Sequence, residues 1–236
     1  TFIPQKLQNI MTRKSLLLIM IIISSCSNDV KFNKANKRML NNDYNKAIKN
    51  YTEVITNEPE HHEALHNRGV CYLKIEEIEK SIDDLAKAST LFANDIYFFN
   101  LALAQIKNQE LDNALNSLKK IKNESNEIEN EELHLQKGNV LFKLGKYKES
   151  LLEYEKIENS KNIMLIKGIN QYHTQEYQNS YQTLKEHELN NKQQSIIYIY
   201  LGSCALNLKE FKNAITYFEI YLNKEEKMPN LFTKEY

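Results

Sequence analysis

The sequence predicts an all-α solenoid of about six helix–turn–helix repeats. Small residues recur in six pairs, and the two members of each pair lie twelve positions apart. The pairs are Ala35 and Ala47, Gly69 and Ser81, Ala102 and Ala114, Gly138 and Ser150, Gly168 and Ser180, and Gly202 and Ala214. Successive pairs begin 34, 33, 36, 30 and 34 residues apart. A period near 34 residues is typical of stacked helical pairs, none of which buries its apolar face alone.

The twelve-residue spacing is explained by two helices joined by a short turn. The first small residue lets the first helix approach its partner closely, and the second does the same on the second helix. Only three Pro and five Gly occur in 236 residues, which argues against a loop-rich β fold. The chain carries 31 basic and 31 acidic residues, so its net charge is near zero, and its sequence does not resemble the basic footprint that phosphate neutralisation requires. We expect no nucleic-acid partner.

The residues around the pairs resemble tetratricopeptide repeats. The segments LGKYKESLLEYEKI (residues 144–157) and NNDYNKAIKNYTEVITNEP (residues 41–59) follow the pattern of that family closely. The fifth repeat departs most from it, with Gln171 and His187 at positions where the family has apolar or small residues. The resemblance implies a right-handed superhelix whose concave face binds protein or peptide partners.

The resemblance covers residues 28–228. It places the starts of the six repeats near residues 28, 62, 95, 131, 161 and 195. Residues 229–236 are expected to form a C-terminal tail or a partial cap, since a solenoid needs a polar end to its last repeat. Hence the chain is expected to form one continuous array. The last helical pair is a candidate surface for a homodimer.

The N-terminus resembles a bacterial lipoprotein signal peptide. Met11 precedes two basic residues, a short apolar run and the small tetrad that ends at Cys26. The apolar run is too short to span a bilayer comfortably, and secretory signals have this arrangement. The resemblance implies cleavage over residues 11–25, diacylglycerol and a further chain such as palmitate at Cys26, and a tether over residues 26–30. Residues 1–10 are expected to be an upstream extension.

In the resembling family, fixed positions of each first helix line the concave face. In this chain most of those positions are apolar, which favours an amphipathic helix or an extended apolar segment as the partner. The predicted groove residues are Ile96, Phe99, Leu103, Ile106, Leu135, Asn139, Phe142, Leu165, Ile169, Tyr172 and Ile199. Relatives that bind a peptide carboxylate have Lys and Asn in the first repeat. Here Phe32 and Asn36 stand at those positions, so that carboxylate clamp is incomplete.

One motif suggests catalysis. Residues 62–66, HEALH, match the pattern in which two helical His bind zinc and the Glu acts as a base. A zinc peptidase that uses His62, Glu63 and His66 is therefore an alternative function. The same residues are also an ordinary repeat start, and a repeat array offers no scaffold for a third ligand. We therefore expect no enzyme activity, catalytic residue, metal or cofactor.

These observations predict a scaffold that is lipid-anchored in the bacterial cell envelope, at the outer membrane rather than the inner one. Such a scaffold would recruit protein or peptide partners, for example during assembly of an outer-membrane complex. A cytosolic adaptor, with a misassigned N-terminus, remains the other alternative.

Overall fold

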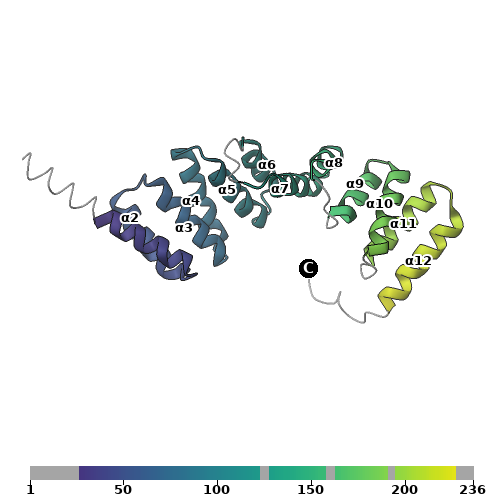
Figure 1. Cartoon of the computed structure of the whole chain (residues 1–236), viewed down its shortest axis with the longest axis horizontal. Helices are drawn as coiled ribbons and strands as arrows, with labels where there is room; N and C mark the ends of the chain where they lie inside the picture. Colours follow the sequence, from purple (N-terminus) through teal and green to yellow (C-terminus); the bar gives the residue numbers. More distant parts are fainter. Residues whose placement is uncertain (1–26, 123–127, 158–162, 191–194, 227–236) are drawn as a thin grey trace, which may run out of the picture. The chain divides into compact units, whose positions relative to one another are not determined.

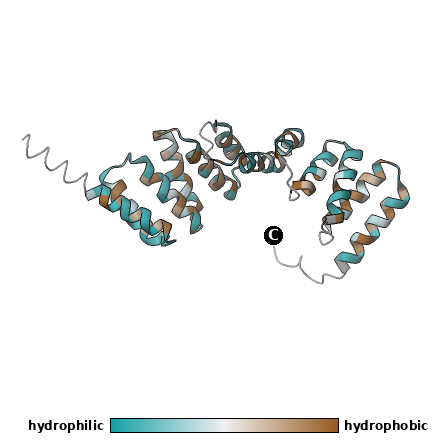
Figure 2. Ribbon diagram, viewed as in Figure 1, coloured by the Kyte–Doolittle hydropathy of each residue, from teal (hydrophilic) through white to brown (hydrophobic). Residues whose placement is uncertain are grey.

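The protein is all-α, as the sequence predicts. A computed structural model describes residues 27–122, 128–157, 163–190 and 195–226, and within these ranges it contains helices and short turns but no strand (Figure 1). Most helices carry both polar and apolar residues (Figure 2), whereas the helix Ile196–Asn207 is mostly apolar. No helix in the described ranges combines the length and the hydrophobicity that crossing a membrane would require.

The chain divides into an N-terminal unit, Thr1–Glu127, and a C-terminal unit, Ile128–Tyr236. The N-terminal unit contains a helix over residues 27–40, then α2 (Tyr44–Asn57), α3 (His62–Lys74), α4 (Ile78–Leu91), α5 (Asp95–Lys107) and α6 (Leu111–Lys119). The C-terminal unit contains α7 (Asn130–Lys143), α8 (Tyr147–Glu155), α9 (Met164–His173), α10 (Tyr177–Asn190), α11 (Ile196–Asn207) and α12 (Phe211–Glu226).

Each unit is a stack of three helical pairs, here called repeats 1–3 and repeats 4–6. The first helix of a repeat is called helix A and the second helix B. From α2 to α6 and from α7 to α12, every helix packs against the next one along the chain. The handedness of a superhelix over the whole chain stays a prediction.

The turn between helices A and B is the same in all six repeats. Its middle residue has positive φ in each case: Asn42, Glu76, Gln109, Gly145, Gln175 and Lys209. In repeat 4, Gly145 N–H donates to the Phe142 carbonyl at 2.9 Å and Lys146 N–H donates to the Leu141 carbonyl at 2.9 Å. This pair of bonds is the Schellman motif, which satisfies the last carbonyls of helix A.

The small-residue pairs lie inside the repeats and join the two helices. Ser150 Oγ donates to the Gly138 carbonyl at 2.8 Å, and Ser180 Oγ donates to the Gly168 carbonyl at 2.7 Å. A Cβ atom added to Gly168 would lie 2.5 Å from Leu184 Cγ. At Gly168 the first small residue therefore makes room for a large side chain of helix B. In repeats 4 and 5 the second small residue also bonds to the backbone of helix A.

Several predictions fall on residues that the structure does not describe. These are the upstream extension (1–10), the signal peptide (11–25), the lipid anchor Cys26, the start of the fifth repeat at residue 161, and the tail (229–236). Cys71 and Cys204 are described, and both are free and buried. Burial raises the pKa of the Cys71 thiol to about 12, so this thiol is unreactive at neutral pH.

Candidate partner-binding face

The A helices of neighbouring repeats contact one another within each unit. In the N-terminal unit α3 contacts α5, and in the C-terminal unit α9 contacts α11. The B helices separate the A helices along the chain, so these contacts bring together side chains that lie more than 30 residues apart. We call the side chains that the A helices present along these rows the A-helix face.

Most of the predicted groove residues are accessible on this face. Phe99 and Ile169 are 9% and 7% exposed and lie in the interior, and their place in a groove stays a prediction. The partly exposed residues are Ile96, Leu103, Ile106, Leu135, Asn139, Phe142, Leu165, Tyr172 and Ile199.

Some accessible groove residues also stabilise the stack. Leu135 packs against a buried cluster that includes Tyr154. Asn139 Oδ1 accepts a hydrogen bond from the Tyr154 hydroxyl at 2.8 Å. Leu165 and Tyr172 pack against the buried cluster around Leu184. These side chains are held in place by neighbours, which limits the entropy lost when a partner binds them.

A ladder of polar side chains runs across repeats 1–3. Asn36 Oδ1 accepts hydrogen bonds from the Tyr51 hydroxyl at 2.6 Å and from Asn67 Nδ2 at 3.1 Å. His66 Nδ1 lies 3.0 Å from Asn67 Oδ1, and His66 Nε2 lies 2.9 Å from Asn100 Nδ2. The ladder therefore links the first three A helices through side-chain hydrogen bonds.

The hydrogen bonds of the ladder define the protonation state of His66. An imidazole that faces an amide oxygen on one side and an amide NH₂ on the other is satisfied when it is neutral, with its proton on Nδ1. The ring also stacks on Tyr97, with centroids 4.2 Å apart. Burial lowers the pKa of His66, and both observations favour the uncharged ring.

The HEALH residues take part in this packing. His62 Nδ1 lies 3.0 Å from the Tyr97 hydroxyl, and its ring stacks on Phe92 with centroids 4.7 Å apart. Both ring nitrogens of His66 face amide groups, as described above, whereas Glu63 is exposed. Among the described residues, no group of three or more His, Cys, Asp or Glu side chains is arranged to hold a metal ion. The observed geometry explains the motif as packing between repeats 2 and 3.

The C-terminal unit carries six aromatic rings that touch in a continuous patch, here called the ring patch. Its members are Phe142, Tyr147, Tyr172, His173, Tyr177 and Tyr200. Tyr147 stacks on His173 with centroids 4.2 Å apart, and Phe142 meets Tyr147 edge to face at 5.5 Å. Tyr172 meets Tyr200 edge to face at 5.4 Å. Hence α7, α9 and α11 each contribute a ring to one surface.

The ring patch is uncharged at neutral pH. Burial, together with the nearby Tyr147 and Tyr172, raises the pKa of Tyr200. Burial lowers the pKa of His173, so this imidazole is neutral as well. The patch therefore offers aromatic faces and phenol hydroxyls rather than ionic contacts.

The sequence analysis predicted only some residues of the polar ladder and of the ring patch. Phe142 and Tyr172 were predicted as groove residues, whereas Tyr147, Tyr177 and Tyr200 were not. Tyr147 and Tyr177 are the first residues of B helices, outside the A-helix positions that the resemblance provides. Their spacing of 30 residues equals that of Gly138 and Gly168, and this shared register was the available signal.

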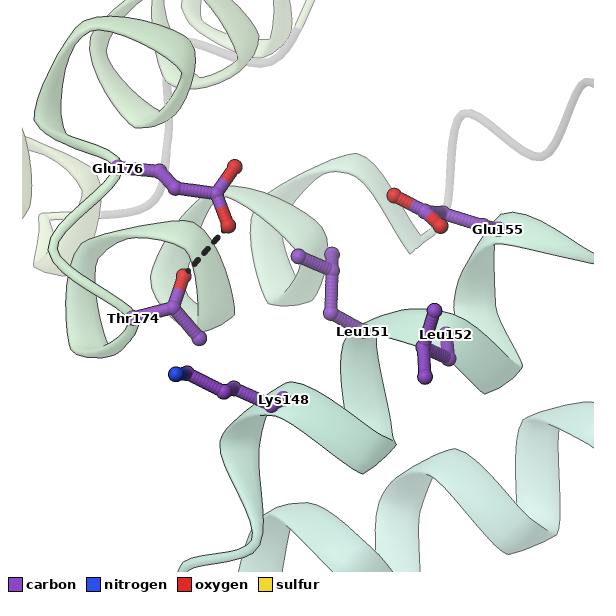
Figure 3. A pocket seen from close by; sticks show the side chains of 6 residues that line it. All are labelled: Lys148, Leu151, Leu152, Glu155, Thr174 and Glu176. Carbon is purple, nitrogen blue, oxygen red and sulfur yellow. Dashed lines mark hydrogen bonds between the residues drawn. The ribbon is translucent and has the colours of Figure 1, made fainter.

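A separate hollow of about 330 Å³ lies between α8 and the turn that follows α9 (Figure 3). Leu151 and the exposed Leu152 form its apolar part, and Lys148 lies on its rim. The Thr174 hydroxyl donates to Glu176 at 3.0 Å beside it. Its residues come from a B helix and a turn, so the hollow is distinct from the A-helix face.

Comparisons with known proteins show what the repeats are similar to. Residues 32–96 match a family model described as tetratricopeptide repeat. A search of curated protein sequences finds no match. Among solved structures, the chain is similar to PilF of Pseudomonas aeruginosa, with 14% identity and a TM-score of 0.58, over 82% of this chain and 90% of that one.

Two further solved structures share the fold. PilW, described as a widely conserved type IV pilus biogenesis factor, has 12% identity and a TM-score of 0.60, over 86% of this chain and 95% of that one. YrrB, described as having an unusual peptide-binding site, has 18% identity and a TM-score of 0.62, over 76% of this chain and 90% of that one. At these identities the similarity shows the fold alone.

Proposed function

We propose that this tetratricopeptide repeat protein is an envelope-anchored scaffold that binds a protein or peptide partner through its A-helix face. One observation carries the proposal. Apolar and aromatic side chains on this face, such as Leu103, Phe142 and Tyr172, stay partly exposed although the helices around them are fully packed. Apolar groups that gather on an accessible surface are typical of interaction sites.

The structural relatives support this proposal in two respects. YrrB is described as a tetratricopeptide repeat protein with a peptide-binding site, which is the activity proposed here. PilW is described as a pilus biogenesis factor, which supports a role in assembling an envelope structure. We propose that the partner is a component of an outer-membrane complex.

The anchoring part of the proposal depends on the residues from Met11 to Cys26. Cleavage before Cys26 and acylation of its thiol would tether the repeats to a membrane, with the outer membrane favoured. Two or more acyl chains give stable attachment, whereas a single chain gives marginal attachment.

Co-purification from the native envelope tests the binding proposal. Leu103→Lys places a charge on the A-helix face of α5, and Leu152→Lys places one on helix B at a residue that is 59% exposed. We expect the partner to be lost with Leu103→Lys and kept with Leu152→Lys, with both variants folded by circular dichroism. If both variants retain the partner equally, the binding proposal is contradicted.

Labelling with radioactive palmitate tests the anchor separately. Labelling that disappears in Cys26→Ala supports the lipoprotein assignment. Labelling that persists in Cys26→Ala means that Cys26 is not the anchor. A chain that carries no label and stays in the cytosol would instead support the cytosolic adaptor.

We further propose that the last helical pair mediates self-association. Phe211, Ile215 and Leu222 are 59%, 58% and 58% exposed and share one face of α12. Sedimentation of the wild-type chain is expected to show a dimer, and Ile215→Glu is expected to yield a monomer. A wild-type monomer at high concentration would remove this part of the proposal.

A further inference from the structure

We infer that one side of the first helix lies on acidic phospholipid headgroups of the membrane that anchors the chain. This helix covers residues 27–40, and the side in question is here called the end face. Its members are all exposed, and they are Val30, Asn33, Lys34, Lys37 and Leu40. The inference rests on the anchor at Cys26 in the proposed function, and it names the surface and the class of lipid that the anchor would bring together.

The end face corresponds to a side of helix A that later repeats bury. In repeats 2, 3, 5 and 6 the preceding helix B packs against helix A. The residue five positions before the small residue of helix A is buried in these repeats: Ala64, Tyr97, Ile163 and Ile197. Ala64, for example, belongs to one buried cluster with Tyr51 and Val54 of α2. In the first repeat Val30 holds the same register, and it is 64% exposed.

A lysine in this register argues against a covering helix. Two positions after the small residue of helix A, every later repeat has an uncharged residue that is fully buried: Cys71, Ala104, Val140, Asn170 and Cys204. The first repeat has the exposed Lys37 there. A packed helix would remove water from this ammonium group without pairing it, which is strongly unfavourable. A layer of lipid headgroups keeps the ammonium group hydrated while its carbon chain contacts apolar surface.

The charges of the first helix leave two cations available on the end face. The helix contains four basic residues and one acidic residue, Asp29. Lys31 and Arg38 are engaged by side chains of α2. Lys34 and Lys37 form no ion pair with any residue in the described ranges. These two lysines are therefore free to meet phosphate groups.

The end face also has the residue pattern of a helix that lies in a membrane interface. At about 3.6 residues per turn, its five members fall within an arc of about 120°, and this arc contains no acidic residue. Val30 and Leu40 are 64% and 82% exposed, so an apolar side chain lies on each side of the lysine pair along the helix. Lysines combined with accessible apolar side chains are typical of helices that bind acidic lipid surfaces.

The short tether selects the membrane as the occupant. Cys26 precedes Val30 by four residues, which span at most ~14 Å even when fully extended. Acyl chains on Cys26 would therefore hold the end face close to the headgroup layer, where each lysine is attracted by the surface potential of acidic lipids. An acidic protein would have to displace these headgroups to reach the same lysines.

A fluorescent probe on the end face tests the inference with the full, acylated chain. Asn33→Cys adds an accessible thiol for labelling, whereas Cys71 and Cys204 are buried and Cys26 would be blocked by its lipid. The labelled protein is reconstituted into vesicles of phosphatidylcholine alone or of phosphatidylcholine and phosphatidylglycerol in equal parts, both containing a lipid with a quencher on its headgroup. We expect stronger quenching in the mixed vesicles. We expect the excess to be lost at about 1 M salt, where the screening length falls to about 3 Å.

Lysine variants separate the end face from the rest of the first repeat. Lys34→Gln/Lys37→Gln is expected to lower the quenching in mixed vesicles to the level found with phosphatidylcholine alone. Lys46→Gln/Lys49→Gln is the matched control, because both lysines are exposed on α2 of the same repeat and lie outside the end face. We expect this control to behave as wild type. A probe at Asn116→Cys, exposed on α6, is expected to show no dependence on acidic lipid.

Several outcomes would overturn the inference. Equal quenching in both kinds of vesicle contradicts a contact with acidic lipid, and so does an equal loss of quenching in the two pairs of lysine variants. A blue shift of the probe emission without quenching would assign the end face to a second copy of the chain or to a protein partner.

The anchor and the lipid contact can fail separately. If palmitate labelling depends on Cys26 but the probe does not respond to acidic lipid, the anchor stands and only the lipid contact is wrong. If labelling persists in Cys26→Ala, the anchor itself is removed, and this inference is removed with it.

Discussion

At the middle of every turn between helices A and B, one residue adopts the left-handed conformation. Five of these six residues are not glycine, and they include Glu76 and Lys209. A side chain in this region costs roughly 1–2 kcal/mol, whereas glycine adopts it without steric cost. The Schellman bonds of the turn offset that cost, because they satisfy carbonyls that would otherwise lack partners.

Introducing glycine at one of these turns and removing it from another should therefore change the free energy of unfolding in opposite directions. We expect Glu76→Gly to raise the free energy of unfolding by about 0.5–1 kcal/mol and Gly145→Ala to lower it by about 1 kcal/mol. Gly145 has φ +72° and has no neighbour within 4 Å of an added Cβ. The stability lost in Gly145→Ala would therefore come from backbone strain alone. Denaturant unfolding measures both. Effects of the same sign would contradict this account of the turn.

His66 should make stability dependent on pH. Burial lowers its pKa below the ordinary value of about 6.5, so the unfolded chain binds a proton before the folded chain does. The stabilisation is thus complete above about pH 6.5 and decreases as the pH falls towards the lower pKa of the folded state.

We expect His66→Gln to show a smaller loss of stability than wild type between about pH 7 and pH 5. Glutamine still donates and accepts hydrogen bonds, so it can serve Asn67 and Asn100 without titrating. Urea unfolding at each pH compares the two proteins. Identical pH dependence in both would show that His66 is not the titrating group.

At the scale of the helix, the repeats depend on a small residue facing a large one. Gly69, Gly138, Gly168 and Gly202 each face a Leu, Tyr or Phe side chain sixteen residues later. The sequence predicted that small residues bring the two helices together, because their spacing is periodic. It did not show the opposing large residue, since Leu and Tyr also occur at many other positions.

Gly168→Ala should separate the two helices of repeat 5. The added Cβ would lie 2.5 Å from Leu184 Cγ, which could move away only if the fully buried Leu184 side chain changed its rotamer or the helices shifted. We expect a loss of about 1–3 kcal/mol in the free energy of unfolding. An unchanged or higher melting temperature would mean that the helices are not in tight contact here.

The ring patch shows why part of the site could not be predicted at this scale. A resemblance assigns groove positions one helix at a time, and it selected Phe142 and Tyr172 in this way. Tyr200 stands at a different position of its helix and joins the patch only because α9 and α11 are adjacent. Contacts between repeats depend on how the helices rotate when they pack, which single-helix periodicity does not report.

At the scale of the whole molecule, the period near 34 residues was sufficient to predict the fold. Each repeat contacts only its neighbours, so the local pattern and the tertiary structure are almost the same information. Function is harder to predict from the period, because the period reports the surface that the repeats form and not the individual side chains on it. The repeats provide a surface, and individual side chains such as His66 decide whether a motif like HEALH is a ligand set or a packing contact.

The most direct test of the central claim is photo-crosslinking in the native envelope. A benzophenone amino acid is placed at Ile96 or Leu103 on the A helix of repeat 3, and at Lys87 or Leu152 as exposed controls on B helices. We predict that the two A-helix positions yield the same crosslinked partner and that the two B-helix positions do not. Crosslinks that form from the B helices alone would contradict the claim that the A-helix face binds the partner.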